Sequence, residues 1–478
     1  MTIGWCFDNT YSKLPDTFKE NINPIPVKKP ELVILNKSLA EKLDLNFSGI
    51  KENEISELFA GNLIPSESNS IAQAYAGHQF GHFTMLGDGR AVLIGEHLSK
   101  KKDRYDIQFK GSGKTAFSRN GDGRAALGPM LREYIISEAM YNLGIPTTRS
   151  LAVVKTGEEV IRETSLQGAI LTRVASSHIR VGTFQYIAAR QKKDELEILQ
   201  DYVINRHYPI IKDSKNKSID LLKNVLDKQI DLVVNWMRVG FIHGVMNTDN
   251  MSILGETFDY GPYGFMEDYL PSYVCNHSDH QGRYAFKNQP YIGLWNCSAL
   301  GHALSSLISE ESQDEILKTY ESIFQNKLAE LYRKKLGFIN SHNEDAQLIQ
   351  GLLDIMESEK LDYTNTFRNL AQAVTEVKTN ELNSDIAMSW IKSYQERHHK
   401  ESEPIVEKIL VMNANNPKYI LRNYMAQEVI EAAENLDYSS LETLIEVITF
   451  PYDELEKHEH FACRSPDWAK NLEISCSS

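Results

Sequence analysis

Residues 241–250, together with Asp259, carry the residue types of a divalent-cation site. The residues that follow predict a hairpin, with strands at 252–254 and 257–259 joined by a two-residue turn. In that register Ser252 lies opposite Asp259, and Asn250 is diagonal to Asp259 on the same face. An amide oxygen and a carboxylate so placed can bind one hard cation such as Mg²⁺, with substrate phosphates completing its coordination.

The same stretch parallels the catalytic loop of protein kinases, in which His-Arg-Asp-x-x-x-x-Asn is followed by Asp-Phe-Gly. Here His243 and Asn250 hold the outer positions, and Asp259 begins the last motif as Asp-Tyr-Gly. Val245 occupies the position of the catalytic aspartate, and valine cannot accept a proton. The pattern therefore indicates a phosphate and metal site without ordinary kinase chemistry. The alternative is that Asn250 and Asp259 only form turns.

Upstream, a glycine-rich turn and a lysine at the end of a strand provide groups suited to holding phosphates. Gly87-Asp88-Gly89-Arg90 precedes a strand, where glycines let the backbone approach a ligand and the arginine adds charge. Lys110 closes the next strand, where a kinase has its phosphate-binding lysine. A carboxylate on the following helix must orient that lysine. Glu133 and Glu138 both fit this role, and helical periodicity does not separate them.

The predicted elements run from a glycine-rich and strand-rich part into a helical part. They are strands at 91–94 and 105–109, a helix from Pro129 to a stop at 144–146, and a helix from a Ser218 cap to Gly240. Residues 1 to about 60 read as an irregular extension, and beyond about 300 the pattern is almost wholly helical. This order predicts a small β-rich lobe on a larger helical lobe, with a ligand cleft between them.

Composition excludes several classes of function. The 478 residues carry a net charge of −14, which disfavours bulk binding to nucleic acid. No apolar run approaches the roughly 18 residues of a membrane span, and the N-terminus has no signal or transit pattern. The five cysteines are scattered without a C-x-x-C pair, which predicts a reducing, cytoplasmic location.

Several ordered motifs across nearly the whole chain resemble the selenoprotein O family. They are Tyr75-Ala76-Gly77-His78-Gln79-Phe80-Gly81, Leu86-Gly87-Asp88-Gly89-Arg90, residues 118–124, 144–149, 243–252 and 275–279, and the tail from Pro466 to Ser478. The resemblance implies an α+β, bilobal protein-kinase-like fold with a small β-rich N-lobe, a larger helical C-lobe and a helical C-terminal extension. The expected parts are residues 1–60, 61–185, 186–300 and 301–478.

The resemblance also implies roles for individual residues of this chain. The nucleotide-binding positions correspond to Gly87, Gly89, Arg90, Lys110, Asp122, Gly123, Arg173, Arg180 and Asp259. Glu133 corresponds to the carboxylate that orients Lys110. Asn250 and Asp259 correspond to the ligands of Mg²⁺ or Mn²⁺, and Asp249 to the proton acceptor.

The implied activity is transfer of AMP from ATP to Ser, Thr or Tyr hydroxyls of proteins, with the nucleotide reversed relative to a kinase. Self-modification is included, and neither nucleic acid nor a membrane is an expected partner. Transfer of UMP from UTP with Mn²⁺ and a non-catalytic pseudokinase scaffold are the alternatives. Cys476 corresponds to the selenocysteine position of animal members. We expect it to form a reversible redox pair, with Cys275 as its partner.

Overall fold

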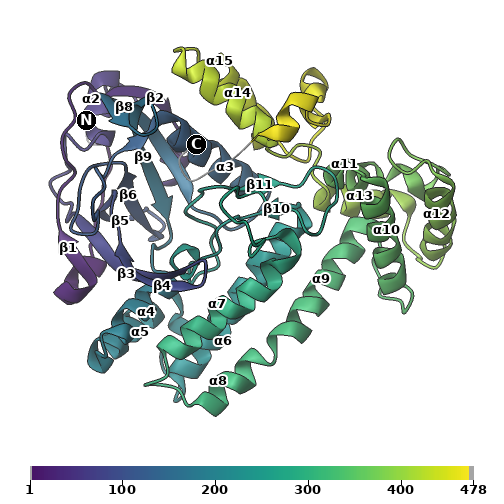
Figure 1. Cartoon of the computed structure of the whole chain (residues 1–478), viewed down its shortest axis with the longest axis horizontal. Coiled ribbons are helices and arrows are strands. Elements are labelled where there is room, and N and C mark those ends of the chain that lie inside the picture. Colours follow the sequence, from purple (N-terminus) through teal and green to yellow (C-terminus); the bar gives the residue numbers. More distant parts are fainter. Residues whose placement is uncertain (1–2, 473–478) are drawn as a thin grey trace.

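A nine-stranded antiparallel sheet forms one part of the molecule within residues 3–472, which the computed structural model describes (Figure 1). Its order is β1-β3-β5-β6-β9-β8-β2, with β4 paired to β3 and β7 paired to β9. The strands are β1 Lys19–Asn21, β2 Glu31–Leu35, β3 Ile71–Gln79, β4 His82–Gly87, β5 Ala91–Leu98, β6 Arg104–Lys110, β7 Ala125–Ala126, β8 Arg149–Ile161 and β9 Ser165–Ala175. A separate short pair joins β10 Phe241–Ile242 to β11 Gly264–Phe265.

Helices make up most of the remainder, and the prediction of an α+β chain is confirmed. They are α1 Lys37–Lys42, α2 Glu52–Phe59, α3 Leu127–Asn142, α4 Val181–Ala189, α5 Lys193–His207, α6 Lys217–Arg238, α7 Gln289–Ala303, α8 Glu310–Leu317, α9 Tyr320–Leu336, α10 Asp345–Glu359, α11 Tyr363–Asn369, α12 Asp385–His398, α13 Ile405–Asn415, α14 Asn423–Glu434 and α15 Ser439–Thr449. Within residues 3–472, every helix is too short or too polar to cross a lipid bilayer.

The elements predicted around the site are present, with small shifts at their ends. Strands β5 and β6 cover the two predicted strands, and β6 ends at Lys110. Helix α3 begins two residues before Pro129. Helix α6 begins at Lys217 after Asn216, so the predicted Ser218 cap is wrong and Ser218 lies inside the first turn. The prediction of a mainly helical chain beyond residue 300 is confirmed.

The N-terminal residues are part of the sheet and its core, so the expectation of an irregular extension is wrong. Strand β1 pairs with β3, and β2 pairs with β8. Leu39 of α1 and Phe59 of α2 are buried in a cluster that also contains Ile107 and Ile170 of the sheet. The proline-rich sequence hid this role because each strand and helix here is short, while the apolar face they cover comes from distant residues.

Helix α3 lies between the sheet and the C-terminal helices, and nearly all of its side chains are buried. One side of α3 contacts β8 and β9, and another contacts α14 and α15 (Figure 1). At Gly128 an added Cβ would lie 3.1 Å from Cγ2 of Ile430, so glycine allows close packing of α14. The end of the chain therefore supports the helix that carries Glu133.

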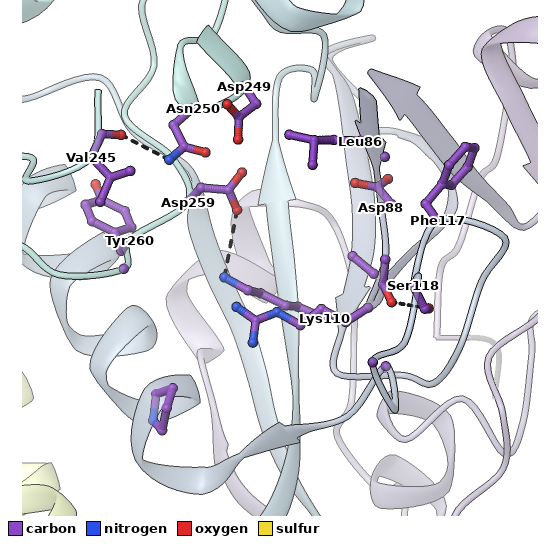
Figure 2. Close-up of a pocket in the computed structure, with 18 of the residues that line it drawn as sticks. Leu86, Asp88, Lys110, Phe117, Ser118, Val245, Asp249, Asn250, Asp259 and Tyr260 are labelled. Carbon is purple, nitrogen blue, oxygen red and sulfur yellow. Dashed lines mark hydrogen bonds and ion pairs between the residues drawn. The ribbon is translucent and has the colours of Figure 1, made fainter. Parts of the chain in front are cut away.

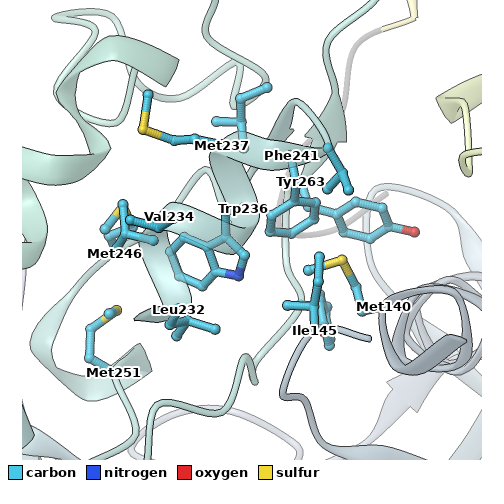
Figure 3. Packing of buried hydrophobic residues seen from close by; sticks show 14 of the residues in the cluster. Met140, Ile145, Leu232, Val234, Trp236, Met237, Phe241, Met246, Met251 and Tyr263 are labelled. Carbon is cyan, nitrogen blue, oxygen red and sulfur yellow. The ribbon is translucent and has the colours of Figure 1, made fainter. Parts of the chain in front are cut away.

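Trp236 connects α6 to the segment that carries Asp259. Its indole is fully buried among side chains that include Met140 and Ile145 near α3 and Met246 and Met251 of the following loop (Figure 3). The indole N–H donates a hydrogen bond to Oγ1 of Thr257 at 2.9 Å. Packing and this polar contact together fix the position of the chain two residues before Asp259.

We expect Trp236→Ala to lower the free energy of unfolding by about 3–5 kcal/mol, because it opens a cavity and leaves the Thr257 hydroxyl without its donor. Urea denaturation followed by circular dichroism measures this loss. Phe450→Ala is the matched control: this ring is half-exposed, and its removal should change stability by less than about 0.5 kcal/mol. Equal losses in the two variants would contradict the proposed role of Trp236.

Candidate active site

A cavity of about 630 Å³ lies where the sheet meets the segment 245–262. Every predicted nucleotide, metal and proton-acceptor residue except Arg180 lines it. The lining residues include Gly87, Gly89, Arg90, Lys110, Asp122, Gly123, Glu133, Arg173, Asp249, Asn250 and Asp259. Figure 2 shows Asp249, Asn250 and Asp259 pointing toward one another, with Lys110 reaching them from β6. The fold thus brings together residues from six separate stretches of the chain.

The loop carrying Asp249 and Asn250 is held against β3 by side-chain hydrogen bonds. The backbone N–H of His78 donates to Oγ1 of Thr248 at 2.8 Å. The side-chain amide of Asn250 donates to the carbonyl of Val245 at 3.0 Å (Figure 2). With its amide nitrogen engaged in this way, Asn250 has its carbonyl oxygen available for a cation.

Asp259 lies in a cluster of cationic side chains. Its Oδ1 accepts from Arg173 at 2.8 Å, its Oδ2 accepts from Arg180 at 2.8 Å, and Nζ of Lys110 lies 3.8 Å from Oδ1. Burial by itself raises a carboxyl pKa, but Arg173, Arg180 and Lys110 outweigh it and hold the pKa of Asp259 well below its ordinary value. The carboxylate is therefore ionised at neutral pH, as a metal ligand must be.

The predicted hairpin register around Asp259 is wrong. Met251 pairs with Thr257 as an isolated bridge, Ser252 pairs with Arg180, and Thr257 also bridges to Thr147. Asp259 itself adopts the left-handed conformation, with φ of 57°. The segment bends toward β9 and the start of α4, where Arg173 and Arg180 pair with Asp259, because these ion pairs and the packing of Trp236 outweigh local strand preference.

Glu133, and not Glu138, contacts the predicted lysine. Oε2 of Glu133 lies 2.5 Å from Nζ of Lys110, and its Oε1 accepts from Nε of Arg173 at 2.7 Å. Glu138 instead forms a bidentate ion pair with Arg149. The structure thus decides between the two carboxylates that helical periodicity left open.

The charges of this network act in opposite directions on its members. Burial has the largest effect on Lys110 and lowers its pKa to about 8, although Glu133 acts in the opposite direction. For Glu133, burial raises the pKa, but Arg173 and Lys110 together hold it below its ordinary value. At neutral pH, Lys110 is mainly protonated and Glu133 is ionised, so the ion pair persists.

Asp249 is a buried carboxylate with one oxygen left free. Its side chain is 6% exposed, and Oδ1 has no hydrogen-bond partner among residues 3–472. Burial raises the pKa of Asp249 to about 6. A Cβ at Gly77 would come within 1.9 Å of Oδ1, so only glycine leaves room for this carboxylate. A group of this kind accepts protons near neutral pH.

Gly87, Gly89 and Gly123, in the turns 87–90 and 121–124, are required by close contacts. A Cβ at Gly87 would lie 2.3 Å from the ring of Phe117, and one at Gly89 would lie 2.8 Å from the Phe117 carbonyl oxygen. Gly123 has φ of 70°, and an added Cβ would collide with the backbone of Gly113. The first turn and the loop 111–123 therefore pack directly on each other above the cavity.

Two of the predicted nucleotide-binding residues, Arg180 and Asp122, lie apart from the rest. Arg180 is fully buried behind Asp259, where its guanidinium also donates to the carbonyl of Asp249 at 2.7 Å and lies 4.0 Å from the ring centroid of Tyr75. Asp122 is exposed and pairs with Arg162 at 2.8 Å. Arg180 is thus placed to orient the site from behind.

The sequence reasoning missed several residues that build the site. Asn247, Phe80, Phe117 and Arg162 all line the cavity. Oδ1 of Asn247 accepts from the N–H of Phe80 at 3.1 Å. Asn247 lies within the segment 243–252 and Phe80 within the motif 75–81, so their closeness in sequence to predicted site residues could have indicated that they line the cavity. Arg162 lies in the turn between β8 and β9, and nothing local indicated its approach to Asp122.

Cys275 lies directly behind the loop of the candidate site. Its Sγ is 3.6 Å from the carbonyl oxygen of Ile242, and a Cβ at Gly244 would lie 2.8 Å from that sulfur. Burial raises the pKa of the Cys275 thiol. Cys476 lies outside the described residues, so the redox pairing of these two cysteines stays a prediction.

The geometry defines a site in which buried cations, two candidate metal ligands and a free carboxylate share one cavity, as in proteins that act on nucleoside polyphosphates. Comparison with known proteins points to the same kind of site. A family model described as protein adenylyltransferase SelO matches residues 3–449. The chain therefore belongs to the SelO family, as the motifs suggested, and is an enzyme of the nucleotidyltransferase class.

Relatives named protein nucleotidyltransferase YdiU match almost the whole chain. The protein of Pelagibacter ubique is 55% identical over 460 residues, which cover 95% of each chain. That of Nitrosococcus oceani is 50% identical over 466 residues, covering 96% of this chain and 94% of the relative. That of Syntrophotalea carbinolica is 47% identical over 482 residues, covering 99% and 98%.

Glu256, three residues before Asp259, makes the stability of the fold depend on pH. Its carboxylate accepts hydrogen bonds from the hydroxyl and the N–H of Ser176, at 2.5 and 3.3 Å. Burial raises the pKa of Glu256 from an ordinary 4.5 to about 7. The folded state binds this proton more tightly than the unfolded chain, so this group's contribution makes stability fall as pH rises from about 4.5 to about 7.

We expect Glu256→Gln to remove this fall, because glutamine keeps an acceptor for Ser176 and carries no charge. Above pH 7 the variant should gain up to about 3 kcal/mol in free energy of unfolding relative to the parent, and below pH 4 the two should be similar. Urea titrations at pH 4, 6 and 8 measure the difference. A constant difference across this range would show that Glu256 does not titrate in this way.

Proposed function

We propose that this enzyme transfers AMP from ATP to hydroxyl side chains of proteins, using a kinase-like, bilobal arrangement with the nucleotide reversed relative to a kinase. The observation that carries the proposal is the position of Asp249, with its unpartnered Oδ1, in the same cavity as Asn250 and Asp259, while Val245 stands where a kinase has its proton acceptor. The family model and the names of the relatives support nucleotidyl transfer in general.

The charge of the inner cavity supports binding of a triphosphate. Lys110, Arg173 and Arg180 are cationic, whereas Glu133 and Asp259 are anionic, so this inner cluster carries one net positive charge. These groups are largely removed from water. In such surroundings an interaction between charges is several times stronger than at the protein surface. Lys110 and Arg173 of this cluster line the cavity that a polyphosphate tail would fill, and Arg180 lies behind Asp259.

Asn250 and Asp259 fit a Mg²⁺ or Mn²⁺ ion, because both offer oxygen ligands and Asp259 is ionised. Such an ion, bound together with the nucleotide, would offset negative charge on the phosphate oxygens. The remaining work falls to residues of this chain. Glu133 holds Lys110 in place, and Arg173 and Arg180 hold Asp259 in place.

In the proposed reaction the hydroxyl oxygen of the acceptor attacks the α-phosphorus of ATP. An oxygen–phosphorus bond forms, and the bond from the α-phosphorus to the oxygen bridging the α- and β-phosphates breaks. Pyrophosphate leaves with the electron pair, and the hydroxyl proton passes to the carboxylate of Asp249. A pKa of about 6 suits this role, because the group is mostly ionised at pH 7 and still takes up a proton readily.

Transfer of UMP from UTP is a second candidate, because the relatives are named nucleotidyltransferases without reference to a base. The inner cavity described above recognises phosphates and makes no choice between bases. A non-catalytic scaffold fits the observations less well. In a scaffold, the ion pairs of Lys110 with Glu133 and Asp259 would serve only to hold the nucleotide and would take no part in a reaction.

Labelled nucleotides test the reaction directly. With ATP labelled at the α-phosphate and Mg²⁺ or Mn²⁺, we expect label on protein, and with γ-labelled ATP we expect none. Asp259→Asn should lower labelling at least about 100-fold, because it removes a charged ligand and leaves Arg173 and Arg180 without their partner. Label from the γ-phosphate alone would indicate a kinase, and label from neither would indicate a scaffold. α-labelled UTP distinguishes the second candidate.

A matched pair of variants on α3 tests the role of the Lys110 ion pair. Glu133→Gln should lower kcat for AMP transfer about 10- to 1000-fold, because Lys110 and Arg173 lose their shared carboxylate. Glu138→Gln should lower thermal stability through the loss of the Arg149 ion pair but keep kcat for the folded protein. Steady-state kinetics and thermal unfolding of both variants measure the two effects. Similar kcat values would refute the assignment of Glu133.

A further inference from the structure

The turn between β3 and β4 contains a phenylalanine in a backbone conformation that phenylalanine rarely adopts. Gln79 pairs with His82, so Phe80 and Gly81 form a two-residue hairpin turn. Their φ values are 50° and 89°. Turns of this kind strongly prefer Asn-Gly, because asparagine tolerates positive φ and a large ring does not. Folding alone does not explain Phe80, and unfavourable conformations of this sort are concentrated at functional sites.

Phe80 lines the active-site cavity and is partly exposed. Its N–H is held by Oδ1 of Asn247 at 3.1 Å, and its ring centroid lies 5.4 Å from that of Tyr284. The side chain nevertheless stays 38% exposed, and it lines the same cavity as Asp249. The hairpin therefore places a partly exposed apolar surface at the cavity that contains Asp249.

Strand β4 also has an unpaired edge beside this ring. Among residues 3–472 it pairs with β3 alone, away from the main order of the sheet (Figure 1). The N–H of Asp88 donates to the carbonyl of Gln73, and alternation along the register then directs the N–H and C=O groups of Phe83 and Met85 away from β3. Both side chains are more than 40% exposed. Such an edge accepts an added strand.

A cationic side chain stands next to the same hairpin. The guanidinium of Arg283 lies over the ring of Trp295, 4.8 Å from its centroid, and 3.7 Å from the position of a Cβ at Gly81. Trp295 contacts His78, whose ring in turn contacts Phe83, at centroid distances of 5.1 and 5.2 Å. The surface thus combines exposed rings, free backbone groups and a positive charge.

We propose that this surface binds the acceptor protein as an extended, acidic-flanked segment. The segment adds to the free edge of β4, packs an apolar side chain on Phe80, and directs an acidic side chain to Arg283, which brings its hydroxyl to Asp249. Charge complementarity between Arg283 and the acidic flank selects this occupant. The inference rests on the proposed AMP transfer and adds to it the class of acceptor.

Two variants test the docking surface without disturbing the fold. Phe80→Asn suits the positive φ of the turn, so the hairpin should be retained. Met85→Pro removes an N–H that faces away from β3 and blocks an incoming strand, and proline is tolerated at such edge positions. Ile210→Asn is the control, since Ile210 is 90% exposed on a 3₁₀ turn remote in sequence from the hairpin.

The probe is a synthetic 12-residue peptide with a central serine, alternating apolar residues and flanking glutamates, used with α-labelled ATP. A second peptide has lysines in place of the glutamates. We expect Phe80→Asn and Met85→Pro each to raise KM for the glutamate peptide at least about tenfold, and Met85→Pro to leave the Kd for ATP unchanged. Ile210→Asn should change neither value, and the lysine peptide should have the higher KM for the parent enzyme.

Unchanged KM values in both variants, a lower KM for the lysine peptide, or no labelling of the glutamate peptide by an enzyme that labels itself would each overturn the docking proposal. A loss of ATP affinity in Met85→Pro would overturn it as well, because it would assign the edge to nucleotide binding. Absence of α-label on any protein, including the enzyme itself, would instead refute the proposed AMP transfer.

Discussion

The ion pairs that connect Lys110, Glu133, Arg173, Arg180 and Asp259 are the interaction on which the rest of the site depends. They join the ends of β6 and β9, the middle of α3, the start of α4 and the bend at Asp259. Four of these five charges are buried and Asp259 is partly buried, so each would be costly alone, and every member is stabilised only while its partners stay in place. This mutual dependence fixes the relative positions of sheet, helix and loop.

The pKa of the neighbouring Asp249 is raised, whereas that of Asp259 is lowered, although burial acts on both carboxylates in the same direction. Asp249 lies close to this network, but its Oδ1 has no partner in the described part of the chain, so burial dominates and the pKa rises to about 6. Asp259 is held ionised by its cations, whereas Asp249 is left free to exchange a proton. Two adjacent carboxylates are thus suited to two different tasks, metal binding and proton transfer.

Distant parts of the chain maintain these positions. The N-terminal helices α1 and α2 cover one face of the sheet, and α14 and α15 pack on the helix that carries Glu133. Trp236 links α6 to the segment before Asp259. The inferred acceptor surface on β4 lies beside the same loop, because the N–H groups of His78 and Phe80 bind Thr248 and Asn247.

Local spacing and periodicity were enough to predict the kinds of residue at the site, the strand that ends at Lys110, the long helix before the loop and the α+β class. The assembled fold was needed for the rest. It shows that Lys110 contacts Glu133, which the family resemblance implied and helical periodicity left open, and it corrects the register around Asp259. It also places Arg180 behind that carboxylate and joins residues 1–60 to the sheet. Periodicity states which residues share a face of a helix, but the direction of that face is set by packing against residues far away in the chain. The free edge of β4 and the exposed ring of Phe80 are also features that only the folded structure reveals, since strand pairing and exposure are properties of the assembled sheet.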